Sequence, residues 1–437
     1  MKTKYSVLLG TYVAILMSNS AMPAYGQVLS ANQDDLPELI TLTPKEMRKS
    51  ITASSVKRLD VASFATEALL NHPSISAAQA ALEAEKARAR GMGRKLYNPE
   101  LELDIETAET QTATIGLSQT LDRHGKRKAR TLAGQDNVNA AQATLELVRK
   151  TLQAELLTAL SEYQANYDLL GLAKRKVEFS HSFLSLAQRR EAAGDLSSSD
   201  VLTAKLALSS ALADVARTRT ELSRSAQALI TLTGQVQEAW PMLTGTPNIS
   251  NVTTELPNPD QLPEIRLALA QSRASYSMIS VAQKMRKTDP TIGGRIGGEG
   301  SSILFGVSLA IPLQINNNFQ DSVDIAKAES LQADAGLRRV RRQTIARLNG
   351  SRRRLDAANQ AWQDWQNTGA NQLGTQRDLL KRLWEAGELG ATQYLIQYNQ
   401  TFEAQSASAQ LKATYWRSWF EYLDASNSIP KWLEAIK

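Results

Sequence analysis

The chain of 437 residues contains no cysteine. This absence excludes disulfide bonds, thiolate metal sites, cysteine nucleophiles and a lipid attached to an N-terminal cysteine. After residue 27 the chain also lacks any run of about 18 consecutive apolar residues, so no transmembrane helix is expected there. Any membrane span must therefore consist of strands, because only helices and closed sheets satisfy their backbone groups in lipid.

Aromatic residues are scarce as well, at 6% of the chain, whereas alanine, glutamine, leucine, arginine and glutamate are abundant. That composition is typical of long helices rather than of a compact mixed core. The net charge of +6 is small for this length and does not indicate a nucleic-acid partner. The arginine clusters at 338–342 and 352–354 are interpreted as solvated or interhelical faces of a helix.

The N-terminus has the pattern of a signal peptide. Lys2 and Lys4 precede an apolar run from Val7 to Met17, and small residues follow up to Gly26. The apolar run is too short to span roughly 30 Å of hydrocarbon as a helix. We therefore expect residues 1–26 to be a signal peptide that is removed during export, followed by an N-terminal extension at 27–58.

The rest of the chain is a tandem duplication. Glu191–Leu202 recurs as Trp384–Leu395, and Ile115–Leu121 resembles Phe305–Ile311, at an offset of about 190 positions and in the same order. The predicted repeats are 59–240 and 263–427, separated by a proline-rich linker at 241–262 and followed by a tail at 428–437. The first repeat is predicted to contain a helix, strands at about 100–106 and 112–121, a long helix at 123–191 and a return helix at 197–234. The second is predicted to contain a helix, strands at about 291–297 and 303–311, a long helix at 321–386 and a return helix at 390–427.

Periodicity supports these elements. Residues 123–190 contain no proline and carry apolar residues at heptad-like spacing, which predicts a helix on the order of 100 Å long. Gly194 and Gly387 end the long helices, since glycine tolerates the left-handed conformation after a last turn. Each half is therefore expected to fold as a long antiparallel coiled-coil hairpin.

The strand segments alternate with period two. In Ile303–Ile311 every odd position is large and apolar, and the even positions are mostly small or polar. Such alternation is typical of a membrane β-barrel strand. Four strands cannot close a barrel, so the chain must associate with copies of itself, and the sequence alone permits two, three or four copies.

These features resemble the TolC family of outer-membrane efflux proteins, and the resemblance covers the chain from about Leu59 to Leu423. The motifs that carry it are Asn98-Pro99, the step from Leu117-Ser118-Gln119 to His124-Gly125-Lys126-Arg127, and the Gly-Asp-Leu and Gly-Glu-Leu turns. The Gly-Lys-Arg step and Ile311-Pro312-Leu313 are similar to the heavy-metal cation efflux (CzcC-like) branch.

The resemblance implies a mainly α fold with a small β part. Tandem-duplicated long antiparallel coiled-coil hairpins form an α-helical barrel in the periplasm, and four strands per chain contribute to a trimeric 12-stranded transmembrane β-barrel in the bacterial outer membrane. The implied partners are two further copies, a periplasmic adaptor, an inner-membrane pump of the resistance-nodulation-division type and outer-membrane lipid. The expected function is passive conduction of a solute delivered by that pump, with a divalent metal cation as the first choice of substrate and an organic compound as the second.

Carried over residue by residue, the resemblance gives two groups of candidate residues. Adaptor contacts are expected at the helical turns: Gly194, Asp195, Leu196, Gly387, Glu388 and Leu389. Candidates for the periplasmic gate lie just past the turns: Asp200, Gln393, Tyr394 and Gln397. The second repeat lacks the acidic residues that commonly narrow such channels, since Gln393 and Ile396 occupy the matching positions.

No motif for catalysis or for a cofactor is present. His72, His124 and His181 are far apart without paired spacing, so no metal site is expected. The glycines at 293–298 lack the lysine and hydroxyl of a phosphate-binding loop, and no nucleophile motif occurs. The alternatives are a soluble periplasmic coiled-coil adaptor or scaffold and, more remotely, an envelope hydrolase. The coiled-coil alternative does not explain two alternating strand pairs at matching positions, and the hydrolase alternative lacks any catalytic site.

Overall fold

The computed structural model describes residues 60–436, except residues 71, 108–110, 238, 248, 250–256 and 370–371. The expected signal peptide and N-terminal extension lie outside the described residues, as does part of the expected linker. The elements of the first half are α2 (Val61–Leu70), α3 (Pro73–Met92), β1 (Glu100–Thr107), β2 (Gln111–Thr120), α4 (Lys126–Ala192) and α5 (Ser198–Thr233). Those of the second half are η3 (Pro259–Gln261), α6 (Pro263–Met285), β3 (Thr291–Glu299), β4 (Ser302–Ala310), α7 (Gln320–Thr368), α8 (Gln372–Glu385), α9 (Ala391–Ala425) and α10 (Ile429–Ala435).

Helix α4 runs without interruption for 67 residues. At its start, the Asp122 carboxylate accepts hydrogen bonds from the backbone amides of Lys126 and Arg127. These bonds satisfy two of the free amides of the first turn. Two buried series follow at a spacing of seven residues, Leu145–Leu152–Ala159 and Leu156–Tyr163–Leu170. This is the spacing of a coiled-coil seam, and it keeps one stripe of α4 facing its neighbours along the whole helix.

The corresponding helix of the second half is divided. The prediction of a single helix over 321–386 is wrong, because α7 ends at Thr368 and α8 begins at Gln372. Gly369 follows the last residue of α7 and Gly374 lies in the first turn of α8, and glycine is the least favourable residue in a helix apart from proline. The first repeat has no glycine pair at the matching place, so α4 continues through it.

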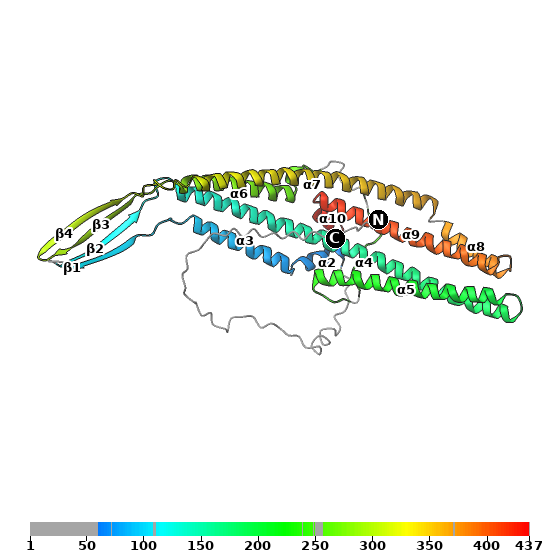
Figure 1. Cartoon of the computed structure of the whole chain (residues 1–437). Coiled ribbons are helices and arrows are strands. Elements are labelled where there is room, and N and C mark those ends of the chain that lie inside the picture. The colour runs from blue at the N-terminus through cyan, green and yellow to red at the C-terminus, as the bar shows by residue number, and fades with distance from the viewer. Residues whose placement is uncertain are drawn as a thin grey trace, which may run out of the picture. The chain divides into compact units, whose positions relative to one another are not determined.

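The four strands form one antiparallel sheet in the order β1-β2-β3-β4. Within each half the two strands form a hairpin, and the pairing of β2 with β3 joins the halves, with Ile115 opposite Ile296. Strands β1 and β4 are the edges, and in Figure 1 the sheet lies at one end of the helices while the turns after α4 and α8 lie at the other.

The largest hydrophobic cluster lies midway along the helices. It combines Trp419, Phe420 and Tyr422 of α9 with side chains of α2, α4, α7 and α10. A second cluster between α3 and α4 contains Ile75, Leu82, Leu145 and Leu152. A third lies at the turns and is described below.

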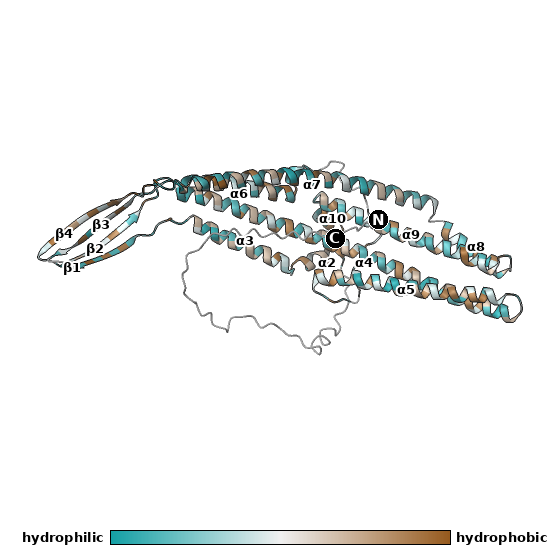
Figure 2. Cartoon of the chain, in the orientation of Figure 1, coloured by the Kyte–Doolittle hydropathy of each residue, from teal (hydrophilic) through white to brown (hydrophobic). Residues whose placement is uncertain are grey.

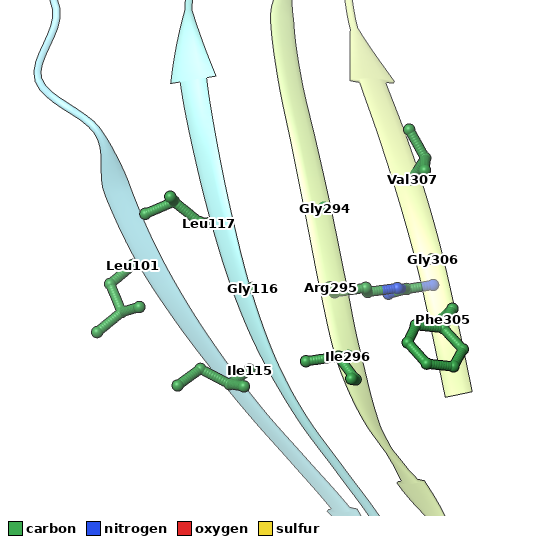
Figure 3. Close-up of a pocket in the computed structure, with 10 residues that line it drawn as sticks. All are labelled: Leu101, Ile115, Gly116, Leu117, Gly294, Arg295, Ile296, Phe305, Gly306 and Val307. Carbon is green, nitrogen blue, oxygen red and sulfur yellow. The ribbon is translucent and has the colours of Figure 1, made fainter. Parts of the chain in front are cut away.

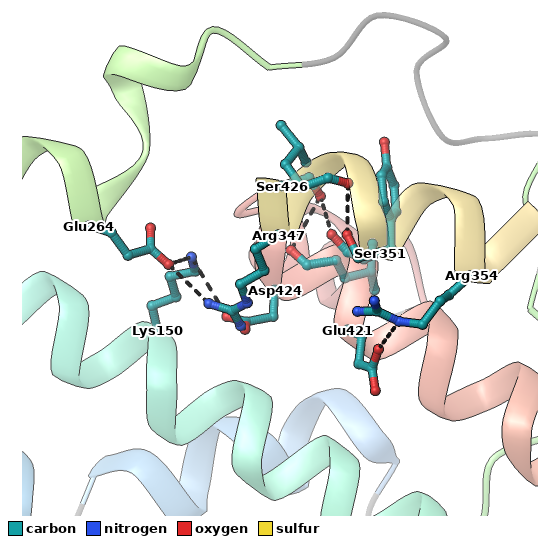
Figure 4. A network of polar contacts seen from close by, with 11 residues as sticks. Lys150, Glu264, Arg347, Ser351, Arg354, Glu421, Asp424 and Ser426 are labelled. Atoms are coloured by element: carbon teal, nitrogen blue, oxygen red, sulfur yellow. Dashed lines mark hydrogen bonds and ion pairs between the residues drawn. The ribbon is translucent and has the colours of Figure 1, made fainter. Parts of the chain in front are cut away.

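Beside the largest cluster, four charged side chains from four helices form a network (Figure 4). Lys150 of α4 lies 2.5 Å from Glu264 of α6 and 3.7 Å from Asp424 of α9, and Arg347 of α7 contacts both carboxylates. Burial lowers the pKa of Lys150 below its ordinary value, and the hydrogen bond to Glu264 offsets only part of this effect. The network therefore joins both repeats at a position where an unpaired charge would be costly.

Every long helix carries hydrophilic residues along its length, as the teal segments of Figure 2 show. Among the described residues, no helix combines the length and the apolar character needed to span a membrane.

Candidate membrane sheet and docking tips

One face of the sheet is apolar and exposed. The register places Leu103 opposite Ile115, Ile115 opposite Ile296, and Ile296 opposite Phe305, so these side chains share a face. Figure 3 shows Ile115, Ile296 and Phe305 on neighbouring strands. Other exposed members of this face are Leu101, Ile105, Leu117, Ile292, Ile303, Val307 and Leu309, with Val307 88% exposed. An apolar surface that covers a whole sheet is unusual for a protein in water and marks a surface that contacts lipid or another protein.

The opposite face of the sheet is polar. Strand β1 contributes Glu100, Glu102, Asp104 and Glu106, all exposed. The neighbouring strands contribute mostly small or hydroxyl residues to this face, such as Ser118, whose hydroxyl donates to Glu102 at 3.1 Å, with Leu304 and Glu299 as larger members. Arg295 lies on this face in β3. The sheet thus separates an apolar from a polar surface, as the alternation predicts.

The sheet is joined to the helices by a junction of Tyr97, His124, Lys126 and Asp289, of which Lys126 and Asp289 are buried. The Lys126 ammonium lies 2.9 Å from the Asp289 carboxylate, which also accepts from Tyr97 at 3.1 Å and lies 3.2 Å from His124 Nδ1. The side chains of Lys126 and Asp289 are only 4% and 1% exposed. Burial alone would raise the pKa of Asp289, but hydrogen bonds from Lys126, His124 and Tyr97 outweigh it, so the pKa lies below its ordinary value. Because Asp289 belongs to the second half, the junction also ties the halves together where they enter the sheet.

At the far end of the helices, the two turns have the same backbone structure. Gly194 and Gly387 adopt the left-handed conformation, with φ of 83° and 76°. The Asp195 amide donates to the Arg190 carbonyl at 2.8 Å, and the Glu388 amide donates to the Leu383 carbonyl at 3.0 Å. Each long helix therefore ends in a Schellman motif, which leaves the glycine and the acidic residue after it exposed.

The structure brings the two turns together through a shared hydrophobic cluster. The buried members of this tip cluster are Phe183, Ala187, Val201, Ala204, Leu380, Trp384, Ala391, Tyr394 and Leu395. Leu196 and Leu389, predicted as adaptor contacts, are half-buried and pack against it. The other predicted contacts, Gly194, Asp195, Gly387 and Glu388, are exposed.

Arg190 links the turns directly. Its guanidinium lies 4.5 Å from the centre of the Trp384 ring and donates to the Trp384 carbonyl at 3.2 Å. The sequence prediction did not include either residue. The aromatic residues of the cluster were recognisable from the sequence. Phe179 and Phe183 are four residues apart, as are Tyr394 and Tyr398, so each pair shares a helix face.

The predicted gate residues occupy different environments. Asp200 forms a capping box with Ser197 at the start of α5, in which the Asp200 amide donates to the Ser197 hydroxyl at 3.2 Å and the Ser197 amide donates to the Asp200 carboxylate at 3.3 Å. Tyr394 is buried and stacks on Trp384, with ring centres 5.4 Å apart and planes 4° apart. Burial, together with the neighbouring Tyr398 and Glu385, raises the pKa of Tyr394 to about 12. Gln393 is exposed and Gln397 half-exposed, so these two remain accessible within one chain.

In the part of the chain that the structure describes, no group of three or more histidine, cysteine or acidic side chains is placed to hold a metal ion. His72 caps α3, where its Nδ1 accepts the Ser74 amide at 3.1 Å, and His124 belongs to the junction. His181 lies exposed on α4. A structural or surface role, as predicted for the histidines, agrees with these positions.

The sequence of this chain is similar to a family of efflux proteins and to metal-resistance proteins. Residues 65–235 match a family model described as Outer membrane efflux protein. The cobalt-zinc-cadmium resistance protein CzcC of Cupriavidus metallidurans is 24% identical over 326 residues, which cover 72% of this chain and 73% of CzcC. The nickel-cobalt-cadmium resistance protein NccC of Alcaligenes xylosoxydans xylosoxydans is 25% identical over 236 residues, and this chain spans about half of it, 53%.

Solved structures share the fold. A crystal structure of CusC aligns with a TM-score of 0.70 at 18% identity, covering 83% of this chain and 90% of CusC. The outer membrane protein VceC from Vibrio cholerae aligns with the same TM-score and identity, covering 83% of this chain and 94% of VceC.

Proposed function

We propose that the chain is the outer-membrane channel subunit of a tripartite efflux pump, supported by the match of residues 65–235 to the outer membrane efflux protein family model and by the similarity to CzcC. The family and the fold are those of channels rather than enzymes. The subunit performs no chemistry and supplies no energy, and solute passes through it after a pump has loaded it.

The observation that carries this function is the two-faced sheet. Its apolar face suits the hydrocarbon of a bilayer and its polar face suits a water-filled lumen. The outer edges of β1 and β4 have no strand partner among the described residues, and lipid cannot satisfy their backbone groups. A closed ring of three copies resolves this conflict, with four strands from each chain. A soluble coiled-coil adaptor or scaffold gives no role to the apolar face.

In this arrangement the helices extend from the outer membrane into the periplasm. The turns at Gly194–Leu196 and Gly387–Leu389 contact the tips of a periplasmic adaptor, which connects the channel to an inner-membrane pump of the resistance-nodulation-division type. The exposure of the turns and their common Schellman geometry support this role, because together they present two similar surfaces to an adaptor. Gln393 and Gln397 are the accessible gate residues, and Asp200 and Tyr394 act by holding the local structure.

The exported solute is proposed to be a divalent transition-metal cation. The support is the similarity to two metal-resistance proteins. The pump selects the solute, so the channel itself needs no metal site. Deletion of the gene for this chain should sensitise cells to cobalt, zinc, cadmium or nickel, and sensitivity only to organic drugs would reassign the substrate.

The test of the channel is the state of the mature protein in the cell envelope. Membranes are separated by density, extracted in detergent and run on gels with and without boiling. A heat-sensitive trimer in the outer-membrane fraction is the expected result. A monomer or dimer in the soluble periplasmic fraction would overturn the proposal.

The role of the turns is tested separately with Gly194→Leu and Gly387→Leu. Nothing lies within 4 Å of a Cβ built at either glycine, so the new side chains project from the surface and strain only the turn. Export should fall while the trimer persists. Gly336→Leu, at another open position on α7, serves as the matched control.

A further inference from the structure

The further inference concerns Arg295 and the edge of the sheet, and it rests on the proposed function. Arg295 lies near the middle of β3, opposite Gly116 of β2 on one side and Gly306 of β4 on the other. It is a cation on a face whose other charged members in β1 are carboxylates. No ion pair of Arg295 is found with any described residue of its own chain.

Gly306 opens a path for the Arg295 side chain across β4. A Cβ added at Gly306 would lie 2.6 Å from Arg295 Nε and 2.9 Å from its Cγ. The side chain therefore passes directly over the backbone of Gly306, and any other residue there would displace it. Figure 3 shows the arginine extending from β3 onto β4 at this position. Since β4 is an edge strand, the guanidinium is directed toward whatever lies beyond that edge.

The opposite edge of the sheet carries the complementary charge. Glu100, Glu102, Asp104 and Glu106 occupy successive polar-face positions along β1, and all are exposed. In a ring of copies, β1 of one chain lies beside β4 of the next, about 4.8 Å away. Every second residue of β1 carries a carboxylate. Any pairing register that puts the two polar faces on the same side therefore places a carboxylate near Arg295.

We propose that Arg295 of one copy crosses Gly306 and pairs with a β1 carboxylate of the next copy, so that the ion pair joins the closing strands of adjacent copies. A charge-assisted hydrogen bond from a planar guanidinium to a carboxylate is stronger than a neutral one and has a defined geometry, so the pair adds a specific link between adjacent copies.

The experiment measures the temperature at which the detergent-extracted trimer dissociates. Arg295→Glu should lower it, and Arg295→Lys should lower it less because the charge is kept. Gly306→Leu should also lower it by displacing the arginine. Gly294→Leu is the matched control, since nothing lies within 4 Å of a Cβ at Gly294 and this position faces the apolar side.

The partner is found by reversing each carboxylate in the Arg295→Glu background, as Glu100→Arg, Glu102→Arg, Asp104→Arg or Glu106→Arg. One of the four double variants should regain the dissociation temperature of the unmodified trimer. Placing the restoring pair on separate, differently tagged chains should favour mixed trimers, which an ion pair within one chain would not do.

Two results would overturn the inference while leaving the channel intact: an unchanged dissociation temperature in Arg295→Glu, or no restoration by any of the four reversals. An unmodified protein that forms no trimer would overturn the proposed function itself, and the ion pair with it.

Discussion

Arg190 of α4 and Trp384 of α8 form a direct contact between the two turns, in which the guanidinium stacks on the indole ring and donates to the Trp384 backbone carbonyl. The carbonyl belongs to the last turn of α8, where the helix dipole favours a positive charge. The contact therefore fastens the end of the second hairpin to the first. Any opening movement that separates the hairpins must break it.

Removing this contact should loosen the closed end of the channel. Arg190→Ala loses a cation–π contact of about 1 kcal/mol and a charged hydrogen bond of about 1.5–3 kcal/mol. We expect a several-fold higher conductance of the purified trimer in planar bilayers at low voltage, with unchanged trimer stability. Arg189→Ala is the control, because Arg189 is exposed and adjacent. Equal conductance in the two variants would show that the contact does not restrict the pore.

The junction predicts a second effect, on stability in acid. Asp289 has a pKa below its ordinary value of 3.8 in the folded state, so its stabilising contribution is present above that value and is lost as the pH falls below it. Asp289→Asn should destabilise the protein by about 3–5 kcal/mol near neutral pH, since it leaves Lys126 buried without a counter-charge. As the pH falls below 3.8, the stability of the variant should also decrease less than that of the unmodified protein.

Thermal unfolding of the detergent-solubilised trimer from neutral to acid pH measures both effects. Asp122 provides the control, because it caps α4 at its surface and is less buried. Asp122→Ala should cost about 1 kcal/mol, as for other helix caps. A larger loss for Asp122 than for Asp289 would contradict the importance assigned to the buried pair.

The sequence was sufficient to predict the order of the elements and the polar and apolar faces of the strands. Alternation at Ile303–Ile311 and the absence of proline in α4 are local signals, and local signals decide local structure. The turns were predictable for the same reason, since Gly194 and Gly387 adopt the left-handed conformation expected after a helix end.

The remaining features depend on contacts that the sequence does not display. The interruption between α7 and α8 could not be located because isolated glycines are tolerated within helices. Tyr394 was predicted near the gate by its position after the turn, whereas its burial depends on packing against Phe183 and Trp384 of other helices. Asp289 before a proline has the pattern of an exposed turn, and only the fold places Lys126 beside it.

The charged network at the centre of the helices should respond asymmetrically to substitution. Lys150→Met removes a charge whose burial is unfavourable and leaves Glu264 paired with Arg347, so the free energy of unfolding should change by less than about 1 kcal/mol. Glu264→Met removes the closest partner of the buried Lys150 and should cost about 3 kcal/mol. Chemical unfolding of the two variants side by side measures the difference, and equal losses would contradict the account.

Tyr394 offers the clearest separation between a gate residue and a core residue. Its ring contacts Phe179, Phe183 and Trp384, and no hydrogen bond of its hydroxyl is found within the described part of the chain. Tyr394→Phe should therefore leave stability and conductance unchanged, whereas Tyr394→Ala should destabilise the tip cluster by about 3–5 kcal/mol, as for other buried aromatic residues. Gln393→Ala, on the exposed side of the same helix turn, should alter conductance without a loss of stability. If Tyr394→Phe instead changed conductance as strongly as Gln393→Ala, the hydroxyl would face the pore in the trimer, and Tyr394 would belong to the gate.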